Sequence, residues 1–473
     1  MSEADVTGGL RAAGQDELAE SLERLEGEAR ARLEAQVEAL DLDLIAGLVE
    51  RLVGGAEEAA GPGEIAPADA IPIPADDAAR ARDREAREAG EELLRSGGVA
   101  AVLLAGGQGT RLGFEGPKGA FPFAPVTGRT LFHHHAAKID AIRRRYGTEL
   151  PWYVMTSPQN DAETRRIFAE AGHYGLAPDS VRFIEQGTMP AVDKATGAIL
   201  REAPDRLALS PDGHGGLLAA LRRHGVLDEL RERGVRTIAT FQVDNPALRV
   251  ARPELLGHHL LAGADMSSVA VRKIGPEEKM GVFATIDGRA GIVEYSDLSD
   301  ELAHRRDASG ELAFWAGSIA VHALEVAFVE RLTGGGPTLP FHRAVKKVPY
   351  VDAEGRPVEP SEPNAVKFET FLFDALPFAE RTVTLESARE DDFAPIKNAE
   401  GSDSPESARR AMNRLYARWL EAAGVEVPRD AEGEPVDLEV DPRRALDAEE
   451  LAASLPPGLT IAGPTALGPE HTA

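Results

Sequence analysis

The feature that most constrains the fold is a short apolar run that leads into a glycine-rich segment. Val99–Leu104 (VAAVLL) is followed by Ala-Gly-Gly-Gln-Gly, and further apolar runs come later in the chain. Short runs that are apolar throughout are typical of buried parallel strands, and helical patterns lie between most of them. The sequence therefore predicts an α/β fold, with a parallel sheet covered by helices on both faces. The further runs are Trp152–Met155, Val181–Ile184, Thr237–Val243 and Ser267–Val271.

The segment before this first strand has a different character. Leucines at helical spacing, with Glu and Arg on the other faces, predict a helical arm over residues 15–54. Residues 55–76 are rich in Gly, Ala and Pro, which predicts an extended linker. A charged helix is expected over residues 77–96. We therefore expect residues 1–95 to form an N-terminal helical arm and linker.

The second half of the chain indicates a hairpin and a small terminal domain. Phe283–Ile286 and Ile292–Tyr295 flank Asp287-Gly288, a pair that suits a tight hairpin turn. A helix is expected over residues 405–423, and short apolar pieces such as Leu459–Ala462 follow it. We predict a catalytic domain over residues 96–395 and a small C-terminal domain with β structure over residues 396–473.

Composition excludes several classes of protein. The chain has 473 residues and a formal net charge of −27, and so acidic a surface repels the phosphate backbone of nucleic acids. It contains no cysteine, which rules out disulfides and thiolate chemistry. The polar, acidic N-terminus does not resemble a signal peptide, and no run of 18 apolar residues suggests a membrane helix. We predict a cytoplasmic protein with neither nucleic acid nor membrane as partner.

The glycine-rich segment predicts a site for a polyphosphate. A strand that runs into a glycine turn places backbone N–H groups at the carboxyl edge of the sheet, and Arg111 and Lys118 add positive charge. The spacing G-x-G-x-x-x-G over Gly107, Gly109 and Gly113 is not that of the dinucleotide-binding fingerprint, and Lys118 is not in a Gly-Lys-Ser/Thr string. The spacing therefore argues against a nicotinamide-dependent dehydrogenase. A measurement that finds no NAD binding would exclude that class of enzyme.

Several strings in order resemble the UDP-sugar pyrophosphorylases, in particular the eukaryotic-type UDP-N-acetylhexosamine pyrophosphorylases. The resemblance covers about residues 75–425. The strings are LLAGGQGTRLGFEGPKG, MTS, EQGTMPA, PDGHGGL, VDNP, VEYSD, PNAVKFETFLFDA and APIKNAEGSDS. The resemblance implies a Rossmann-like nucleotidyltransferase core with a mixed sheet.

The resemblance also implies roles for individual residues. The backbone of Leu104, Ala105, Gly106 and Gly107 is expected to face the uracil, and the amide of Gln186 to read its edge. Gly213 and His214, in a second glycine loop, are expected near the base and ribose. Sugar contacts are expected from Gly281, Glu294, Tyr295 and Ser318, with Phe371 and Phe373, which alternate on a strand-like run, as candidate walls of the sugar pocket.

The charged residues of these strings imply a reaction without a covalent intermediate. Asp244 is expected to hold Mg²⁺, a hard cation that shares its shell with phosphates and water. Because a phosphomonoester is largely ionised at pH 7, a sugar 1-phosphate can attack the α-phosphorus of UTP without a catalytic base. Arg111, Lys118 and Lys397 would stabilise the charge on the leaving pyrophosphate.

The identity of the sugar stays open between two alternatives. N-acetylglucosamine 1-phosphate is favoured by the order of the strings. However, His214 stands where the N-acetylhexosamine subgroup usually has Asn, and Ser318 replaces an Asn that contacts the sugar in relatives. These two departures favour a UTP–glucose-1-phosphate or broad-range enzyme.

A catalytically inactive UDP-sugar-binding regulator is an alternative of a different class, and the retained charged residues argue against it. The protein is expected to be a monomer or homodimer.

His133, His134 and His135 are interpreted as structural residues. They lie in a predicted helix that begins near Thr130. Adjacent helical positions point about 100° apart, so three consecutive histidines cannot easily share one ion. Lys346 and Lys347 are interpreted as solvated or structural.

Overall fold

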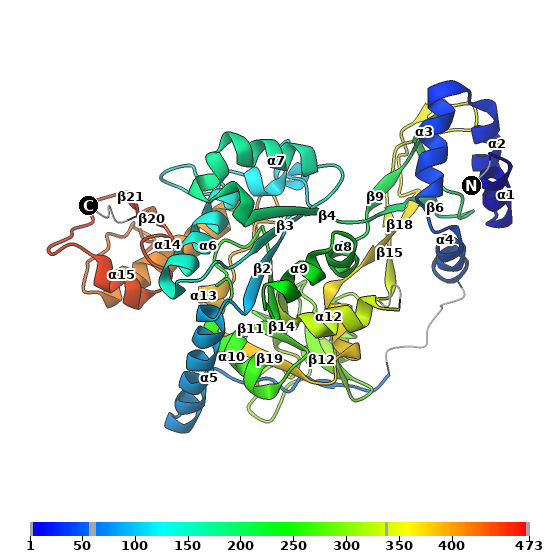
Figure 1. Cartoon of the computed structure of the whole chain (residues 1–473). Helices are drawn as coiled ribbons and strands as arrows, with labels where there is room; N and C mark the ends of the chain where they lie inside the picture. The colour runs from blue at the N-terminus through cyan, green and yellow to red at the C-terminus, as the bar shows by residue number, and fades with distance from the viewer. Residues whose placement is uncertain (1–2, 56–62, 336–338, 470–473) are drawn as a thin grey trace. The chain divides into compact units, whose positions relative to one another are not determined.

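The computed structural model describes residues 3–55, 63–335 and 339–469 (Figure 1). Its contacts divide the chain into two compact units, each built from separate stretches of sequence. Unit 1 comprises residues 1–63, 186–217 and 338–374, and unit 2 comprises residues 64–185, 218–337 and 375–473. These boundaries differ from the predicted segment boundaries at residues 95 and 395, and the independent folding of the three predicted segments stays a prediction.

Unit 2 is organised around a sheet that has ten strands within the described residues. The main path runs β1-β12-β14-β10-β2-β3-β4, with β11 paired to β14 and β19, and β13 paired to β12. The strands are β1 (Ile65–Pro67), β2 (Val99–Leu104), β3 (Trp152–Thr156), β4 (Val181–Glu185), β10 (Thr237–Gln242), β11 (Met266–Arg272), β12 (Val282–Ile286), β13 (Arg289–Val293), β14 (Ala316–Glu325) and β19 (Thr382–Ser387).

The sheet is mixed, which confirms the expectation from the family resemblance. The apolar runs alone had predicted a parallel sheet, and that prediction was wrong for the sheet as a whole. Strands β10, β2, β3 and β4 are parallel neighbours, and all five predicted apolar runs form strands. Strand β14 is antiparallel to both β10 and β11, so it joins the parallel part to the hairpin of β12 and β13. The predicted Asp287-Gly288 turn closes this hairpin, and both residues have positive φ, as a tight hairpin turn requires.

Helices cover the parallel part of the sheet. Helix α6 (Leu131–Tyr146) connects β2 to β3, α7 (Asp161–Glu170) connects β3 to β4, and α9 (Val226–Glu232) precedes β10. Helix α5 (Asp77–Arg95), predicted as the charged helix, packs beside α10 (Pro253–Ala262) (Figure 1). The described helices of this unit also include α11 (Asp300–His304), α12 (Val326–Thr333), α13 (Arg389–Asp392), α14 (Pro405–Ala422) and α15 (Ala448–Ser454).

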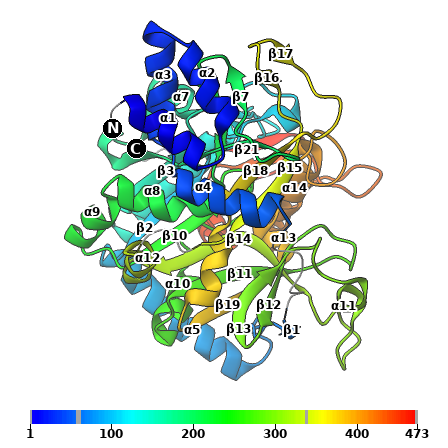
Figure 2. The same cartoon turned by 90° about the vertical axis from the view of Figure 1, so that its right-hand side faces the viewer.

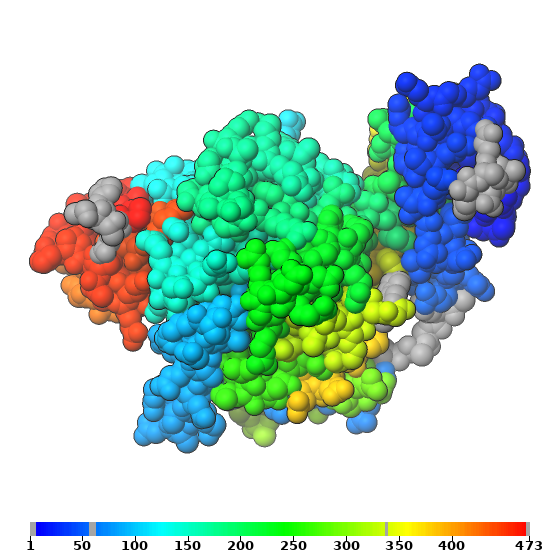
Figure 3. All heavy atoms as spheres, in the orientation of Figure 1, coloured from blue at the N-terminus to red at the C-terminus, as the bar shows by residue number. Residues whose placement is uncertain are grey.

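The C-terminal residues pack on unit 2. Two short parallel strands, β20 (Leu438–Val440) and β21 (Thr465–Leu467), supply the predicted β structure. Figure 3 shows this segment, in red, against the cyan residues around α6. Ion pairs join the two regions, with Arg443 bound to Asp140 at 2.8 Å and Arg145 bound to Asp447 at 2.6 Å.

Unit 1 begins with the N-terminal helices (Figure 2). The arm predicted over residues 15–54 is not one helix but α2 (Asp16–Arg24), α3 (Gly27–Glu38) and α4 (Leu42–Leu48), followed by a π turn. The chain is extended at Leu25, and Asp41 caps the start of α4, which explains the breaks. The apolar faces of these helices form a core with residues of β5 (Thr188–Pro190), β6 (Val192–Asp193) and β18 (Ala365–Thr370).

The predicted linker is only partly observed. Residues 56–62 lie outside the described residues. Beyond them, Ile65–Pro67 pair with β12 and Ile71 bridges to Leu385, so residues 65–71 run along unit 2 as extended chain. Within the described residues, no helix is long and apolar enough to span a membrane.

The crossing of α5 and α10 gives a prediction about stability. A Cβ added at Gly257 would lie 1.6 Å from the carbonyl oxygen of Ala86. Gly257→Ala should therefore lower the free energy of unfolding by about 1–3 kcal/mol, the usual cost of overpacking, as measured by denaturant unfolding.

Gly47→Ala is the matched control. This helical glycine has nothing within 4 Å of the added Cβ, so the substitution should stabilise the protein by roughly 0.5–1 kcal/mol. Equal effects of the two substitutions would contradict the close approach of α5 and α10.

Candidate functional site

The glycine-rich loop after β2 binds its own carbonyl groups internally and leaves N–H groups open. Asn160 donates to the carbonyl of Ala105 at 3.0 Å, Ser157 to that of Gly106 at 2.9 Å, and the N–H of Lys118 to that of Gly107 at 3.0 Å. Within the described residues, the N–H groups of Gly106 and Gly107 donate to no protein acceptor. The loop therefore presents donors without acceptors, which is the polarity that a phosphate or a carbonyl oxygen needs.

The glycines of this loop serve two purposes. A Cβ at Gly109 would lie 2.7 Å from the ring of Phe114, and one at Gly119 would lie 2.2 Å from the ring of Phe132. Packing thus excludes side chains at both positions. At Gly107 a Cβ would meet nothing within 4 Å. Protein packing therefore does not explain Gly107, and the open space leaves its backbone accessible to close approach by a ligand.

Lys118 and Asp244 meet at the carboxyl edge of the parallel strands. Strands β2 and β10 pair in parallel, with Leu104 opposite Gln242, so the segments that follow them leave the sheet side by side. The ammonium of Lys118 lies 3.0 Å from Oδ2 of Asp244, and the two side chains are 17% and 15% exposed. The structure thus brings together a cation and a carboxylate that the sequence places 126 residues apart. Ligands of open α/β sheets bind at this edge.

Helix α6 holds the segment that carries Asp244. His135 Nε2 is 3.0 Å from the carbonyl oxygen of Val243, and His134 Nε2 is 3.0 Å from that of Pro246. Lys138 donates to the carbonyls of Pro246 and Leu248, both at 2.6 Å. Burial lowers the pKa of His135 to about 3, so the ring is neutral and can donate from Nε2.

Sequence reasoning missed this clamp, although it interpreted the histidines as structural. Two consecutive histidines bind two different carbonyl groups, in keeping with their divergent directions on the helix. The available signal was a run of polar residues on a buried helix next to the predicted site.

Asn245 ties the same segment to the loop that carries Lys397. Its side chain donates to the carbonyl of Asp392 at 2.7 Å and accepts from the N–H of Ala394 at 3.0 Å. The N–H of Ile396 donates to the carbonyl of Asp244 at 2.8 Å. Lys397, the predicted phosphate contact, therefore directly follows the residue whose N–H binds the carbonyl of Asp244. Its ammonium lies 3.8 Å from Asp403 and is about half exposed.

Arg111 is the third of the cationic residues that the sequence predicted to contact the phosphates, after Lys118 and Lys397. It lies in the 3₁₀ turn Thr110–Leu112 and is exposed. Its side chain has neither an ion pair nor a hydrogen bond to any residue that the structure describes. Arg111 is therefore available to a ligand, and its predicted catalytic role stays a prediction.

Three of the predicted sugar contacts lie together in unit 2. The carbonyl of Gly281 accepts from the N–H of Ser318 at 2.9 Å, and a Cβ at Gly281 would lie 3.1 Å from Oε1 of Glu294. The expectation that the hairpin strand extends to Tyr295 was wrong, because β13 ends at Val293 and both Glu294 and Tyr295 lie beyond it. Tyr295 is 48% exposed.

The second glycine loop forms a separate group in unit 1. Gln186, which is 4% exposed, donates to Oδ1 of Asp212 at 3.2 Å and to the carbonyl of Gly213 at 3.3 Å. Gly213 has φ +86, and a Cβ there would lie 2.3 Å from the carbonyl oxygen of Thr370, so only glycine fits. The amide of Gln186 thus lies at the loop that holds His214.

His214 lies among aromatic rings. Nδ1 accepts from the N–H of Leu372 at 3.1 Å, and the ring centroid is 5.4 Å from Phe371 and 5.9 Å from Phe373. Burial lowers the pKa of His214 to about 4, so the ring is neutral at pH 7. The expected strand through the two phenylalanines was wrong, because β18 ends at Thr370 and Phe373 lies in the 3₁₀ segment Leu372–Phe378.

The predicted site residues therefore fall into three groups. The phosphate and metal group (Leu104–Gly107, Arg111, Lys118, Asp244 and Lys397) and the group of Gly281, Glu294, Tyr295 and Ser318 belong to unit 2. The group of Gln186, Gly213, His214, Phe371 and Phe373 belongs to unit 1. Their union in one nucleotide-sugar site stays a prediction.

The residues around Asp244 fit a magnesium ion that takes most of its ligands from phosphate. The carboxylate already binds a cation, the ammonium of Lys118. Within the described residues, no group of three His, Cys, Asp or Glu side chains could hold a metal by itself. Mg²⁺ commonly binds through one or two carboxylates, with phosphates and water completing its shell.

Comparison with known proteins shows which proteins the chain as a whole is similar to. The family model described as UTP–glucose-1-phosphate uridylyltransferase matches residues 57–407. The mouse (Mus musculus) UDP-N-acetylhexosamine pyrophosphorylase-like protein 1 is 38% identical over 438 residues, which cover 89% of this chain and 86% of the relative. The UDP-N-acetylglucosamine pyrophosphorylase of Saccharomyces cerevisiae is 36% identical over 353 residues, covering 72% and 74%.

Solved structures show the same fold. The uridine diphosphate N-acetylglucosamine pyrophosphorylase of Trypanosoma brucei, solved with an inhibitor, aligns with a TM-score of 0.80 and 29% identity, covering 96% of this chain and 95% of that one. The UDP-glucose pyrophosphorylase of Leishmania major, solved as a point mutant, aligns with a TM-score of 0.61 and 17% identity, covering 90% and 86%. The second likeness concerns the fold alone.

The neutral ring of His214 gives a prediction about pH dependence. Its pKa is about 4 in the folded protein and near 6.5 when unfolded, so the unfolded chain binds the extra proton first as the pH falls. The stability that His214 contributes is complete above pH 6.5 and is lost between pH 6.5 and 4. His214→Asn, whose side-chain oxygen can accept from Leu372, should remove that loss.

Denaturant unfolding at pH 7.5 and pH 5 measures this effect. Between these pH values the wild type should lose roughly 1–2 kcal/mol more stability than His214→Asn. An equal loss in both proteins would contradict a His214 ring that is neutral at pH 7.

Proposed function

The chain belongs to the UTP–glucose-1-phosphate uridylyltransferase family, and from that premise we propose that it joins UTP to N-acetylglucosamine 1-phosphate. The products are UDP-N-acetylglucosamine and pyrophosphate. The observation that carries this proposal is the pair of Lys118 and Asp244 at 3.0 Å, beside a glycine loop with open N–H groups. A polyphosphate needs both features, a fixed positive charge and unpaired donors.

The proposed reaction is an in-line displacement at the α-phosphorus of UTP. An oxygen of the sugar 1-phosphate attacks, the bond between the α-phosphorus and the bridging oxygen breaks, and pyrophosphate leaves with the electron pair. The nucleophile is already an anion, so no side chain has to remove a proton. The task of the protein is to position two anions and to stabilise the charge on the leaving group.

The residues of unit 2 have separate parts in this scheme. The N–H groups of Gly106 and Gly107 orient the nucleotide, and Lys118, Arg111 and Lys397 stabilise the phosphate charges. Asp244 would hold the divalent cation. When bound, Mg²⁺ would neutralise phosphate charge as a Lewis acid. The ammonium of Lys118, which now pairs with Asp244, would then be free to contact a phosphate oxygen.

The preference for the N-acetylated sugar rests on the degree of similarity. The relatives that are at least 36% identical over most of their length carry N-acetylhexosamine or N-acetylglucosamine in their names. The second candidate is a UTP–glucose-1-phosphate or broad-range enzyme. His214 and Ser318, which differ from the asparagines expected for the N-acetylhexosamine subgroup, favour this alternative. The proposal also carries over the predicted cytoplasmic location and a monomeric or homodimeric state.

Pyrophosphate release from UTP, measured with Mg²⁺ and a panel of sugar 1-phosphates, tests the substrate. We expect N-acetylglucosamine 1-phosphate to give a kcat/KM at least tenfold higher than glucose 1-phosphate, because a site built for the acetamido group leaves buried polar groups unpaired without it. A reversed preference would favour the second candidate. Absence of release with every sugar would favour the inactive regulator.

Substitution of Lys118 tests the site. Lys118→Ala should lower turnover by roughly 10²-fold or more, the scale of losing one charge-stabilising donor in a transition state. The matched control is Lys347→Ala, an exposed lysine that we expect to be solvated. Near-wild-type turnover of the Lys118 variant, with both variants folded, would remove Lys118 from the mechanism.

A further inference from the structure

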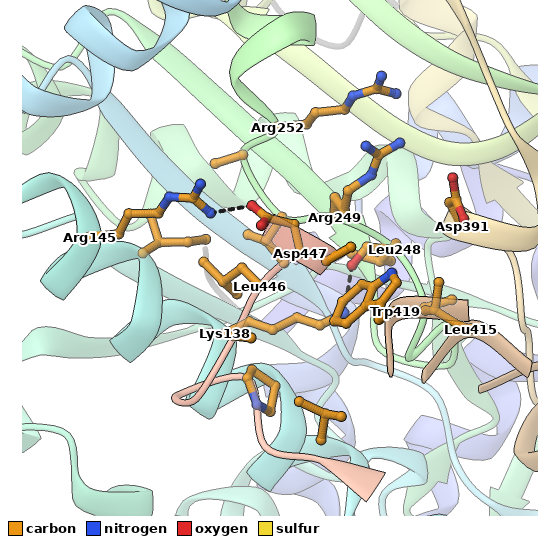
Figure 4. Close-up of a pocket in the computed structure, with 18 of the residues that line it drawn as sticks. Lys138, Arg145, Leu248, Arg249, Arg252, Asp391, Leu415, Trp419, Leu446 and Asp447 are labelled. Carbon is orange, nitrogen blue, oxygen red and sulfur yellow. Dashed lines mark hydrogen bonds and ion pairs between the residues drawn. The ribbon is translucent and has the colours of Figure 1, made fainter. Parts of the chain in front are cut away.

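Unit 2 contains a cavity of about 310 Å³, which is shown in Figure 4. Its walls come from α5, α6, the segment of residues 246–254, α14 and the C-terminal residues 440–449. None of the predicted site residues lines it. Its volume is at the lower end of the range for small-molecule sites.

Polar side chains of this cavity lack protein partners. Tyr416 is 5% exposed, and its hydroxyl makes no hydrogen bond to any residue that the structure describes. Tyr146 and Trp419 also line the cavity. Among the residues that the structure describes, the hydroxyl of Tyr146 and the indole N–H of Trp419 have no side-chain partner. These donors are open to the cavity, and a ligand that accepts from them could form hydrogen bonds that the protein itself does not supply.

One cation of the cavity lacks a carboxylate. Arg145 pairs with Asp447 at 2.6 Å, and Arg252 pairs with Glu254 at 3.1 Å. Arg249 is bound to Asp392 at 2.6 Å. Lys138 is 7% exposed, and its ammonium has only the carbonyls of Pro246 and Leu248 as acceptors among the residues that the structure describes.

The ammonium of Lys138 is therefore incompletely compensated. An ammonium has three protons, and two carbonyl dipoles do not neutralise a full charge. Burial lowers the pKa of Lys138 to about 7, and the nearby charge of Asp392 offsets only part of this effect. An anionic group in the cavity would supply the missing counter-charge.

Most of the remaining lining is apolar, and its two further carboxylates have cationic partners, Arg418 for Asp391 and Arg87 for Glu449. Leu248, Leu415, Leu446 and the indole of Trp419 face the cavity in Figure 4. A wall that combines an aromatic ring with aliphatic side chains suits a flat apolar group. The complementary ligand thus has an apolar ring and an acidic end.

We propose that this cavity binds a small acid, in which an apolar ring carries one carboxylate or phosphate group. The acidic group accepts from Lys138 and Tyr416, and the ring packs on Trp419 and the leucines. Lys138 also holds the carbonyls of Pro246 and Leu248, which follow Asp244 closely in sequence. Occupancy of the cavity therefore alters the position of Asp244, and this link to turnover rests on the proposed function.

Calorimetric titration of the full chain tests the site itself. The probes are indole-3-acetate, its neutral amide indole-3-acetamide, and phenyl phosphate. At least one of the two acids should bind ten or more times more tightly than the amide, and the tighter acid shows which anionic group the site prefers. Absence of binding, or equal affinity for both acids and the amide, would overturn the proposal.

Variants locate the binding. Lys138→Met keeps the apolar stem and should weaken acid binding by at least tenfold. Because this variant can also loosen the segment after Asp244, Trp419→Leu provides a second, independent test and should weaken binding of every probe. The control is Arg165→Met on α7, outside the cavity lining, which should bind as the wild type does. Unchanged acid binding in both cavity variants would overturn the proposal.

Pyrophosphate release measures the link to Asp244. The bound acid should change kcat or KM for UTP at least twofold in the wild type, and it should leave the rate of Trp419→Leu unchanged. An unchanged wild-type rate at saturating acid would overturn the link. A protein with no turnover would refute the proposed function, whereas the titrations would still decide the binding site.

Discussion

The ion pair of Lys118 and Asp244 is the interaction on which the account of this protein depends. Parallel pairing of β2 and β10, with Leu104 opposite Gln242, brings their two following segments to one edge of the sheet. The ion pair is neutral as a whole, so in a chain of net charge −27 the attraction for an anion at this edge comes from the open N–H groups, and from Lys118 once a cation takes its place on Asp244. Such a local field is what a triphosphate requires from an otherwise repelling protein.

Helix α6 and the loop that leads to Lys397 fix the segment after β10. Helix α6 binds its carbonyls through His134, His135 and Lys138, and Asn245 joins it to the loop that leads to Lys397. These are polar groups with buried partners, so a displaced segment would leave several of them unpaired. The position of Asp244 is therefore determined by contacts on two sides, and Lys138 connects it to the cavity between α6 and α14.

The sequence predicted the parts of the fold that local pattern controls. Apolar runs identified β2, β3, β4, β10 and β11, and the Asp287-Gly288 pair identified the hairpin of β12 and β13. Glu294 and Phe373 were mistaken for strand residues, because the alternation continues past the last ladder pairs of β13 and β18. The assembly of unit 1 from three distant stretches, and the clamp of α6 on Pro246, depend on tertiary contacts that no local pattern records.

The most direct test of the central claim is the affinity of the purified protein for UTP with and without Mg²⁺, measured by calorimetric titration. The account requires UTP to bind, and to bind more tightly when Mg²⁺ is present, because Asp244 and the phosphates share the ion. No detectable affinity for UTP in the presence of Mg²⁺ would contradict the assignment of this edge of the sheet as a nucleoside triphosphate site.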